Sequence, residues 1–236
     1  IVEKALESDH PEVATIVNNL GSILHDIGDL AGAKIHYERA LKIDMKALGP
    51  DHPKVAIRVN NLGEVLRNMG NLKGAKEHYD RALKISEKAY GPDHPAVAII
   101  VNNLGEVLRN MGDLKGAKEN FEKALEIDNK VYGSDFDKHP TVAIHIGNLG
   151  KVLRDLGDIA GAKKNFEKTL EIFEEAYGPD FNVHPHTATA LSDLGNVLED
   201  MGDLAGAKKS YERALQIDEM VYGPDHPDVA KDVNSL

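Results

Sequence analysis

The amino-acid sequence predicts an all-α fold, a solenoid built from tandem helical hairpins. Three observations lead to this fold class. The dipeptide His-Pro recurs at nearly constant intervals, the apolar residues between these dipeptides follow helical spacing, and glycines stand where each helix should end. A single hairpin of this kind cannot bury its own apolar face, so neighbouring hairpins must stack on one another.

The His-Pro dipeptides set the length of the repeat. They begin, in chain order, at His10, His52, His94, His139, His184 and His226, so the steps are 42, 42, 45, 45 and 42 residues. The two longer steps contain insertions, GSDFDKHP at 133–140 and GPDFNVHP at 178–185, where another repeat has GPDHP. The sequence realigns directly downstream of each insertion, which places the insertions in surface connections.

One solenoid is predicted over residues 1–236, with five complete repeats at about 11–52, 53–94, 95–139, 140–184 and 185–226. Residues 1–6 align with the end of a second helix, and residues 229–236 align with the beginning of a first helix. The chain is therefore expected to be a fragment of a longer array or a trimmed one. Its exposed ends could associate end to end with another copy.

The second repeat illustrates the two helices of each hairpin. Pro53 suits the first turn, with His52 or Asp51 as the cap, and Gly70 and Gly91 end the two helices. Asn71 is predicted to cap the second helix. Apolar or small residues at helical spacing give the core side of the first helix as Val55, Val59, Leu62, Gly63, Leu66 and Met69, and that of the second as Leu72, Ala75, Tyr79, Ala82, Leu83 and Ile85.

These residues carry a resemblance to a known family. Leu62-Gly63, Gly70, Ala75, Tyr79 and Ala82 match the tetratricopeptide-repeat pattern, and the 42-residue unit with its YGPDHPxVA connector is similar to kinesin light chain repeats and their prokaryotic relatives. The resemblance implies a right-handed α-solenoid whose first helices line a concave surface, and a protein-interaction scaffold as the function. Kinesin light chains often have alanine where this chain has Gly63, Gly105, Gly150 and Gly195.

The side of the first helix opposite the core is predicted to be the binding face. Rotating the helix by 100° per residue places on this side Ile57, Asn60, Asn61, Glu64, Arg67 and Asn68. Equivalent positions form rows along the array, and the fifth repeat departs from them with Asp193 and Glu199. Arg154 follows Lys151 rather than a glutamate, which predicts the most basic point of the face in the fourth repeat and an acidic end in the fifth.

This pattern suits an extended peptide with acidic residues and an apolar anchor. Asparagine side chains both donate and accept hydrogen bonds, arginines bind carboxylates or phosphates, and isoleucines offer apolar seats. The predicted peptide-binding residues are Asn60, Asn61, Asn102, Asn103, Asn148, Arg67, Arg109, Arg154, Lys151, Ile57, Ile99 and Ile144. Alternatives stay open for both residue types. The asparagines could cap a helix, pair with a neighbouring helix or be solvated, and Arg67 and Arg109 could pair with Glu64 and Glu106.

Composition and motifs narrow the remaining classes of function and partner. A net charge of −11 argues against nucleic-acid and anionic-membrane partners, and the absence of cysteine excludes disulfides and thiolate zinc sites. His184, His186 and Asp180 fit no metal-binding template, while Phe136 and Phe181 are predicted to fill gaps between hairpins. We therefore expect a non-enzymatic, cytoplasmic protein without cofactors that binds a protein or peptide partner; an architectural segment and a regulatory array of a larger signalling protein are the alternatives.

Overall fold

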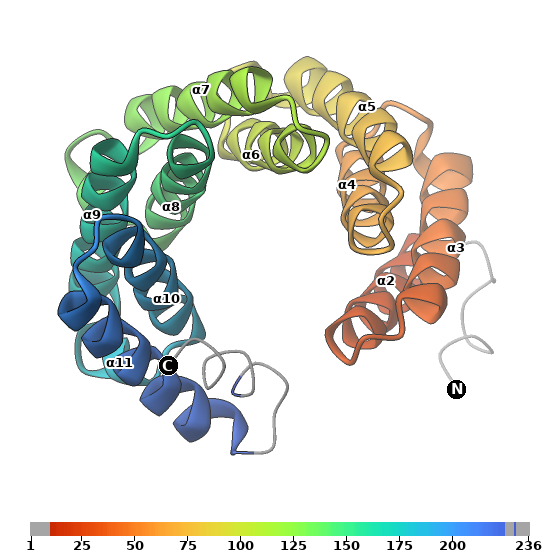
Figure 1. Cartoon of the computed structure of the whole chain (residues 1–236). Coiled ribbons are helices and arrows are strands. Elements are labelled where there is room, and N and C mark those ends of the chain that lie inside the picture. The colour runs from red at the N-terminus through yellow and green to blue at the C-terminus, as the bar shows by residue number, and fades with distance from the viewer. Residues whose placement is uncertain (1–9, 225–228, 230–236) are drawn as a thin grey trace. The chain divides into compact units, whose positions relative to one another are not determined.

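The structure, a computed structural model, describes residues 10–224 and Val229 (Figure 1). This part of the chain contains ten α-helices and two short 3-10 helices, and it confirms the all-α fold class. In chain order they are α2 (Pro11–Asp26), α3 (Leu30–Leu48), α4 (Pro53–Asn68), α5 (Leu72–Tyr90), α6 (Pro95–Asn110), α7 (Leu114–Tyr132), η1 (Gly133–Lys138), α8 (Pro140–Asp155), α9 (Ile159–Tyr177), η2 (Gly178–Val183), α10 (Pro185–Asp200) and α11 (Leu204–Tyr222).

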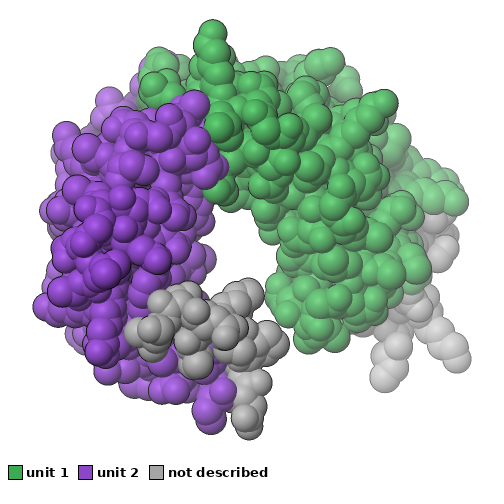
Figure 2. All heavy atoms as spheres, viewed as in Figure 1, with its two compact units in different colours: residues 1–127 green, residues 128–236 purple. Residues whose placement is uncertain are grey.

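The chain divides into two compact units, Ile1–Ile127 (unit 1) and Asp128–Leu236 (unit 2), coloured separately in Figure 2. In unit 1, α2 packs on α3 and α4 packs on α5, and each second helix also contacts the first helix of the next hairpin. Unit 2 repeats this arrangement with the α8–α9 and α10–α11 hairpins. Paired helix-turn-helix repeats stacked in this way form a solenoid. The predicted repeat limits stay a prediction, and the partial repeats predicted at 1–6 and 229–236 lie outside the described residues, apart from Val229.

The ends of the helices follow local signals in the sequence. The Nδ1 atom of His52 accepts a hydrogen bond from the Lys54 backbone N–H at 3.2 Å, so His52 rather than Asp51 is the cap of α4. Gly70 lies just after the end of α4 and has a φ of 79°, a conformation that favours glycine. Asn71 caps α5 by accepting from the Gly74 backbone N–H at 3.0 Å, as predicted.

The core of each hairpin depends on a glycine that lies against an aromatic ring. A Cβ atom on Gly63 would lie 2.9 Å from the Tyr79 ring, and one on Gly105 would lie 2.7 Å from the Phe121 ring. Real Cβ contacts are longer, so glycine is what allows the buried ring to pack on the helix backbone. One core prediction is wrong: Met69 is 48 % exposed, because α4 ends at Asn68 and Met69 is its C-cap.

Gly105→Ala should therefore lower the free energy of unfolding by about 1–3 kcal/mol through overpacking. Gly147→Ala is the matched control, because its Cβ would meet only the Thr169 side chain, at 3.5 Å. That variant should be neutral, or more stable by up to about 1 kcal/mol because alanine favours helix. Urea denaturation followed by circular dichroism measures both, and equal effects of the two substitutions would contradict the packing argument.

The connections between hairpins contain a recurring ring pair. In three of the connections, the tyrosine that ends the second helix stacks on the histidine that caps the next first helix: Tyr90 on His94 at 4.3 Å, Tyr132 on His139 at 4.0 Å, and Tyr177 on His184 at 3.8 Å between ring centroids. The last two pairs span the inserted η1 and η2. The ring pair thus persists whether or not the connection is three residues longer.

The two insertions are connections, as predicted, and their phenylalanines differ in how deeply they are buried. Phe181 is buried where η2 contacts both α9 and α11, and the Arg213 guanidinium lies 5.0 Å from its ring centroid. It therefore fills space between hairpins. Phe136 in η1 is only half-buried. No helix in the described part of the chain has the length and apolar character needed to cross a membrane.

Candidate functional site

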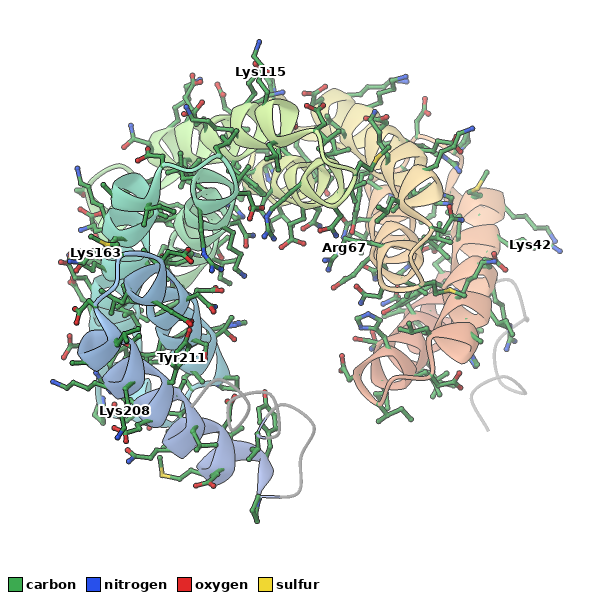
Figure 3. The ribbon with its side chains drawn as sticks, viewed as in Figure 1. Lys42, Arg67, Lys115, Lys163, Lys208 and Tyr211 are labelled. Carbon is green, nitrogen blue, oxygen red and sulfur yellow. The ribbon has the colours of Figure 1, made fainter. Side chains whose placement is uncertain are left out.

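The candidate site is the side of the first helices that faces away from the second helices, here termed the first-helix face. In unit 1, Arg67 lies on this side of α4, whereas Lys42 and Lys115 extend from the second helices α3 and α7 (Figure 3). In unit 2, Lys163 and Lys208 extend from α9 and α11 in the same way. Charged side chains on the second helices thus form a separate surface from the predicted binding residues.

The asparagines of the first-helix face are joined from one hairpin to the next in unit 1. Asn61 Nδ2 donates to Asn18 Oδ1 at 2.9 Å, and Asn103 Nδ2 donates to Asn60 Oδ1 at 3.1 Å. One of the alternatives left open by the sequence, pairing with a neighbouring helix, is therefore what the structure shows. Asn102 and Asn148 are buried, at 5 % and 6 % exposure, and both already interact within the chain.

The hydrogen bonds between paired asparagines use only some of the donors and acceptors of their side-chain amides. A side-chain amide carries two N–H donors and a carbonyl oxygen that can accept twice. The hydrogen bond between Asn60 and Asn103 uses the Asn60 oxygen and one Asn103 N–H, so the Asn60 N–H groups and the Asn103 oxygen can still bind a ligand. Both side chains are half-buried rather than enclosed. Each pair thus presents a donor and an acceptor side by side.

Arg67 pairs with a carboxylate of the following hairpin. Its Nη1 lies 3.1 Å from Glu106 Oε2, and both side chains are about one quarter exposed. The pairing of Arg67 with Glu64 considered from the sequence is therefore wrong. Close contact with the next helix, rather than spacing along one helix, decides which carboxylate the arginine meets. Arg109 also interacts within the chain.

The sequence indicates unpaired basic residues in the fourth repeat, but in the structure they are paired with carboxylates. Arg154 binds Asp200 of α10 with two hydrogen bonds, from Nε at 2.5 Å and from Nη2 at 3.2 Å, and Lys151 Nζ lies 3.3 Å from Asp193 Oδ2. The hydrogen bond from Arg154 lowers the pKa of the Asp200 carboxyl below its ordinary value. The acidic residues of the fifth repeat therefore neutralise the basic residues of the fourth.

The isoleucines predicted as apolar seats line a pocket in unit 1, between α4 and α6. Ile57 and Ile99 are 51 % and 43 % exposed, and the pocket has a volume of about 210 Å³. Its other lining residues include Asn60, so one of the paired asparagines stands at its edge. The remaining lining residues are Pro53, Ala56, Ser86, Tyr90, His94, Ala96 and Ile100.

Ile144 and Lys151 line a pocket at the equivalent place in unit 2, between α8 and α10. The structure thus groups Ile57, Ile99 and Asn60 at one pocket and Ile144 and Lys151 at another. Arg67 and Arg154 line neither pocket.

The sequence analysis missed a buried arginine–aspartate ion pair and a buried histidine–aspartate pair. Arg58 Nε donates to Asp44 Oδ2 at 2.9 Å, and His145 Nδ1 lies 2.6 Å from Asp128 Oδ2. All four side chains are almost fully buried. The sequence does contain a signal for these pairs, at the first-helix position that directly follows Ile57 and its equivalents. In successive repeats this position holds Arg58, Ile100, His145 and Ala190. The second-helix residues opposite them are Asp44, Ser86, Asp128 and Phe173. Pairs with and without an aspartate alternate along the chain, and the two pockets lie at the pairs without one.

Stacked hairpins with a polar face and shallow apolar pockets define a repeat scaffold, a class that is typically non-catalytic and acts in protein–protein interaction. The chain belongs to the tetratricopeptide-repeat family. One family model described as tetratricopeptide repeat matches residues 55–130 and 140–199, and a second matches 13–54 and 187–228.

Solved structures share the fold. BtubC (BKLC) from P. vanneervenii is 24 % identical with a TM-score of 0.72, and the match covers 92 % of this chain and 84 % of that one. A putative kinesin light chain with nearly identical TPR-like repeats from Podosopora anserina is 19 % identical with a TM-score of 0.67, over 91 % of this chain and 98 % of that one. The predicted likeness to kinesin light chain repeats is thus confirmed. No curated protein sequence matches the chain.

Proposed function

We propose that this chain is a non-catalytic scaffold that holds an extended peptide segment of a partner protein on its first-helix face. The observation that carries the proposal is the grouping in unit 1 of the Asn60–Asn103 pair with the pocket lined by Ile57 and Ile99. An extended peptide exposes an N–H and a C=O at each residue, and these groups need partners once water is displaced. A donor and an acceptor beside an apolar pocket meet both needs of an anchor residue.

Charged residues of the first-helix face are expected to contribute less to peptide affinity than the asparagine pair and the apolar pocket. Acidic residues of a peptide would compete with Glu106, Asp193 and Asp200 for cations that these carboxylates already bind. Exposed ion pairs contribute only about 0–1 kcal/mol each, so an acidic peptide can exchange with them without a large cost. We therefore propose an extended peptide with an apolar anchor, in which acidic residues add modestly to affinity.

Selection from a phage-displayed library of random dodecapeptides tests the function. We expect enriched peptides that bind with a Kd on the order of micromolar, about −8 kcal/mol. Asn61→Ala/Asn103→Ala should weaken the binding of such a peptide by about tenfold or more in calorimetric titration, because it removes hydrogen bonds worth about 1 kcal/mol each. Asn120→Ala is the matched control, since Asn120 lies on α7 and binds the Gly116 carbonyl.

No enrichment above background, or equal binding by the asparagine double variant, would refute the peptide-scaffold proposal. A peptide in which every Asp and Glu is replaced by Asn and Gln should bind within about fivefold of its parent, as expected for weak exposed ion pairs. End-to-end self-association stays a separate prediction, and light scattering over a range of protein concentrations measures it directly.

A further inference from the structure

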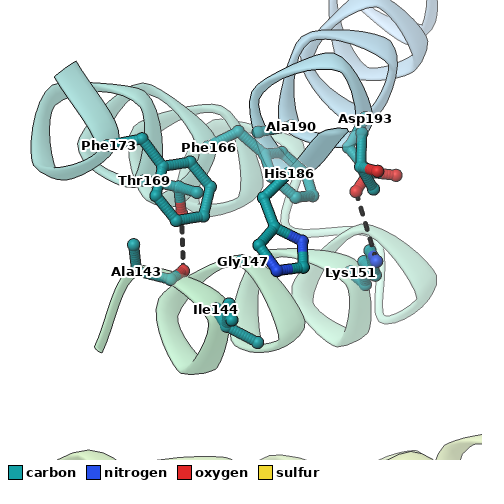
Figure 4. Close-up of a pocket in the computed structure, with 11 residues that line it drawn as sticks. Ala143, Ile144, Gly147, Lys151, Phe166, Thr169, Phe173, His186, Ala190 and Asp193 are labelled. Carbon is teal, nitrogen blue, oxygen red and sulfur yellow. Dashed lines mark hydrogen bonds and ion pairs between the residues drawn. The ribbon is translucent and has the colours of Figure 1, made fainter. Parts of the chain in front are cut away.

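The pocket in unit 2 differs in chemistry from its equivalent in unit 1. It has a volume of about 110 Å³ and is here termed the Gly147 pocket (Figure 4). Helices α8, α9 and α10 all contribute to it. Its lining residues are Ala143, Ile144, Gly147, Lys151, Phe166, Thr169, Phe173, His186, Thr189, Ala190 and Asp193.

Gly147 opens this pocket to the hairpin core. It occupies the position of Asn60 in the second repeat, and a Cβ atom added to it would meet only the Thr169 side chain, at 3.5 Å and 3.7 Å. The space that an asparagine side chain takes in the earlier repeats is therefore vacant, and Phe166 and Thr169 form the floor. The Thr169 hydroxyl donates to the Ala143 carbonyl at 3.1 Å, so the one polar group of the floor is already satisfied.

The walls of the Gly147 pocket are aromatic. Phe173 replaces Ser86 of the unit 1 pocket and is buried, and His186 replaces Ala96 and stacks on it with 6.0 Å between ring centroids. Desolvation, with smaller electrostatic contributions from His184 and Lys151, lowers the pKa of His186 below its ordinary value. A neutral imidazole then adds to an apolar wall rather than a charged one.

The rim of the Gly147 pocket carries one cation and one anion. Lys151 Nζ lies 3.3 Å from Asp193 Oδ2, and Figure 4 shows the two side chains facing each other from α8 and α10. A carboxylate accepts several hydrogen bonds and an ammonium donates three. The pair can therefore accept a peptide N–H at Asp193 and donate to a peptide C=O from Lys151. This rim complements the backbone of a neutral residue whose side chain points into the pocket.

We propose that the Gly147 pocket is a specificity subsite for an aliphatic side chain of leucine or isoleucine size on the bound peptide. The Gly147 pocket has about half the volume of the unit 1 pocket, so a compact aliphatic side chain fits it better than an aromatic ring. The apolar floor and walls exclude a charged one because it would lose its hydration without gaining a partner. The inference rests on the proposed peptide-scaffold function and assigns the chemistry of one subsite.

Methyl NMR with the intact chain tests this subsite. N-acetyl-leucine N-methylamide, which carries the side chain and both peptide planes, should shift the methyl signals of Ala143, Ile144 and Ala190 with a saturable, millimolar Kd. The phenylalanine analogue should bind about tenfold more weakly. Gly147→Asn, which restores the asparagine found at this position in earlier repeats, should reduce the leucine shifts, because its side chain occupies part of the vacant space.

Ser192→Asn is the matched control: it places the same side chain at the equivalent position of the fifth repeat, outside the pocket lining. It should leave the leucine shifts intact. Absent leucine shifts, equal binding by Gly147→Asn, or equal binding of the phenylalanine analogue would overturn the subsite. Should the subsite fail while selected peptides still depend on Asn61 and Asn103, the scaffold proposal stands. Should the leucine probe bind while no peptide is selected, the preference of the pocket for an aliphatic side chain stands and the scaffold proposal falls.

Discussion

Arg58→Ile is expected to lower the free energy of unfolding by about 3–5 kcal/mol, because it leaves Asp44 buried without its cation. Asp44 is fully buried, and its second carboxylate oxygen has no hydrogen-bond partner in the structure. The Arg58 guanidinium also reaches Thr15 Oγ1 at 3.4 Å, so its removal leaves space as well as charge. Urea denaturation followed by circular dichroism measures the loss.

The chain itself supplies the control for this substitution. Ser86 and Ile100 occupy the positions of Asp44 and Arg58 one repeat later, and both are buried there. The double variant Asp44→Ser/Arg58→Ile therefore copies a pairing that this fold already accommodates. It should recover most of the lost stability, since replacing a whole buried ion pair is often neutral. A double variant as unstable as the single one would show that the charge is not the cause.

Phe121→Ala should also lower the free energy of unfolding by about 3–5 kcal/mol. The Phe121 ring is fully buried and lies directly against Gly105, whose lack of a side chain leaves nothing to fill the cavity. Phe136→Ala is the matched control, because the half-buried ring in η1 contributes less packing. The same denaturation measurement compares the two, and a loss as large for Phe136→Ala would contradict the importance of the glycine–ring contact.

Most of the fold could be predicted because its signals are local. A capping histidine, a proline in the first turn and a glycine with positive φ all act within a few residues, so their order in the sequence specifies where each helix begins and ends. Met69 is the instructive exception. Its spacing along the helix suits the core side, but the helix ends one residue earlier and its side chain turns to solvent.

The face of the candidate site could be predicted, whereas its interactions could not. Rotation about a helix axis identifies which residues share a side, and Asn61, Arg67 and Arg154 do lie on the first-helix face. Their partners come from a neighbouring hairpin: Asn18, Glu106 and Asp200 are 43, 39 and 46 residues away. Spacing within one helix contains no information about such contacts. The rows of equivalent positions do contain it, but only when opposing rows are compared in pairs.

The alternation of buried pairs with and without an aspartate limits how such an array can change length. Loss of residues 53–94, one repeat, would set Ile100 against Asp44 and leave a buried carboxylate without a cation. Loss of residues 53–139, two repeats, would set His145 against Asp44 and restore a pairing of the kind that His145 makes with Asp128. A change in length by two hairpins would thus preserve the pairing that a change by one hairpin disrupts.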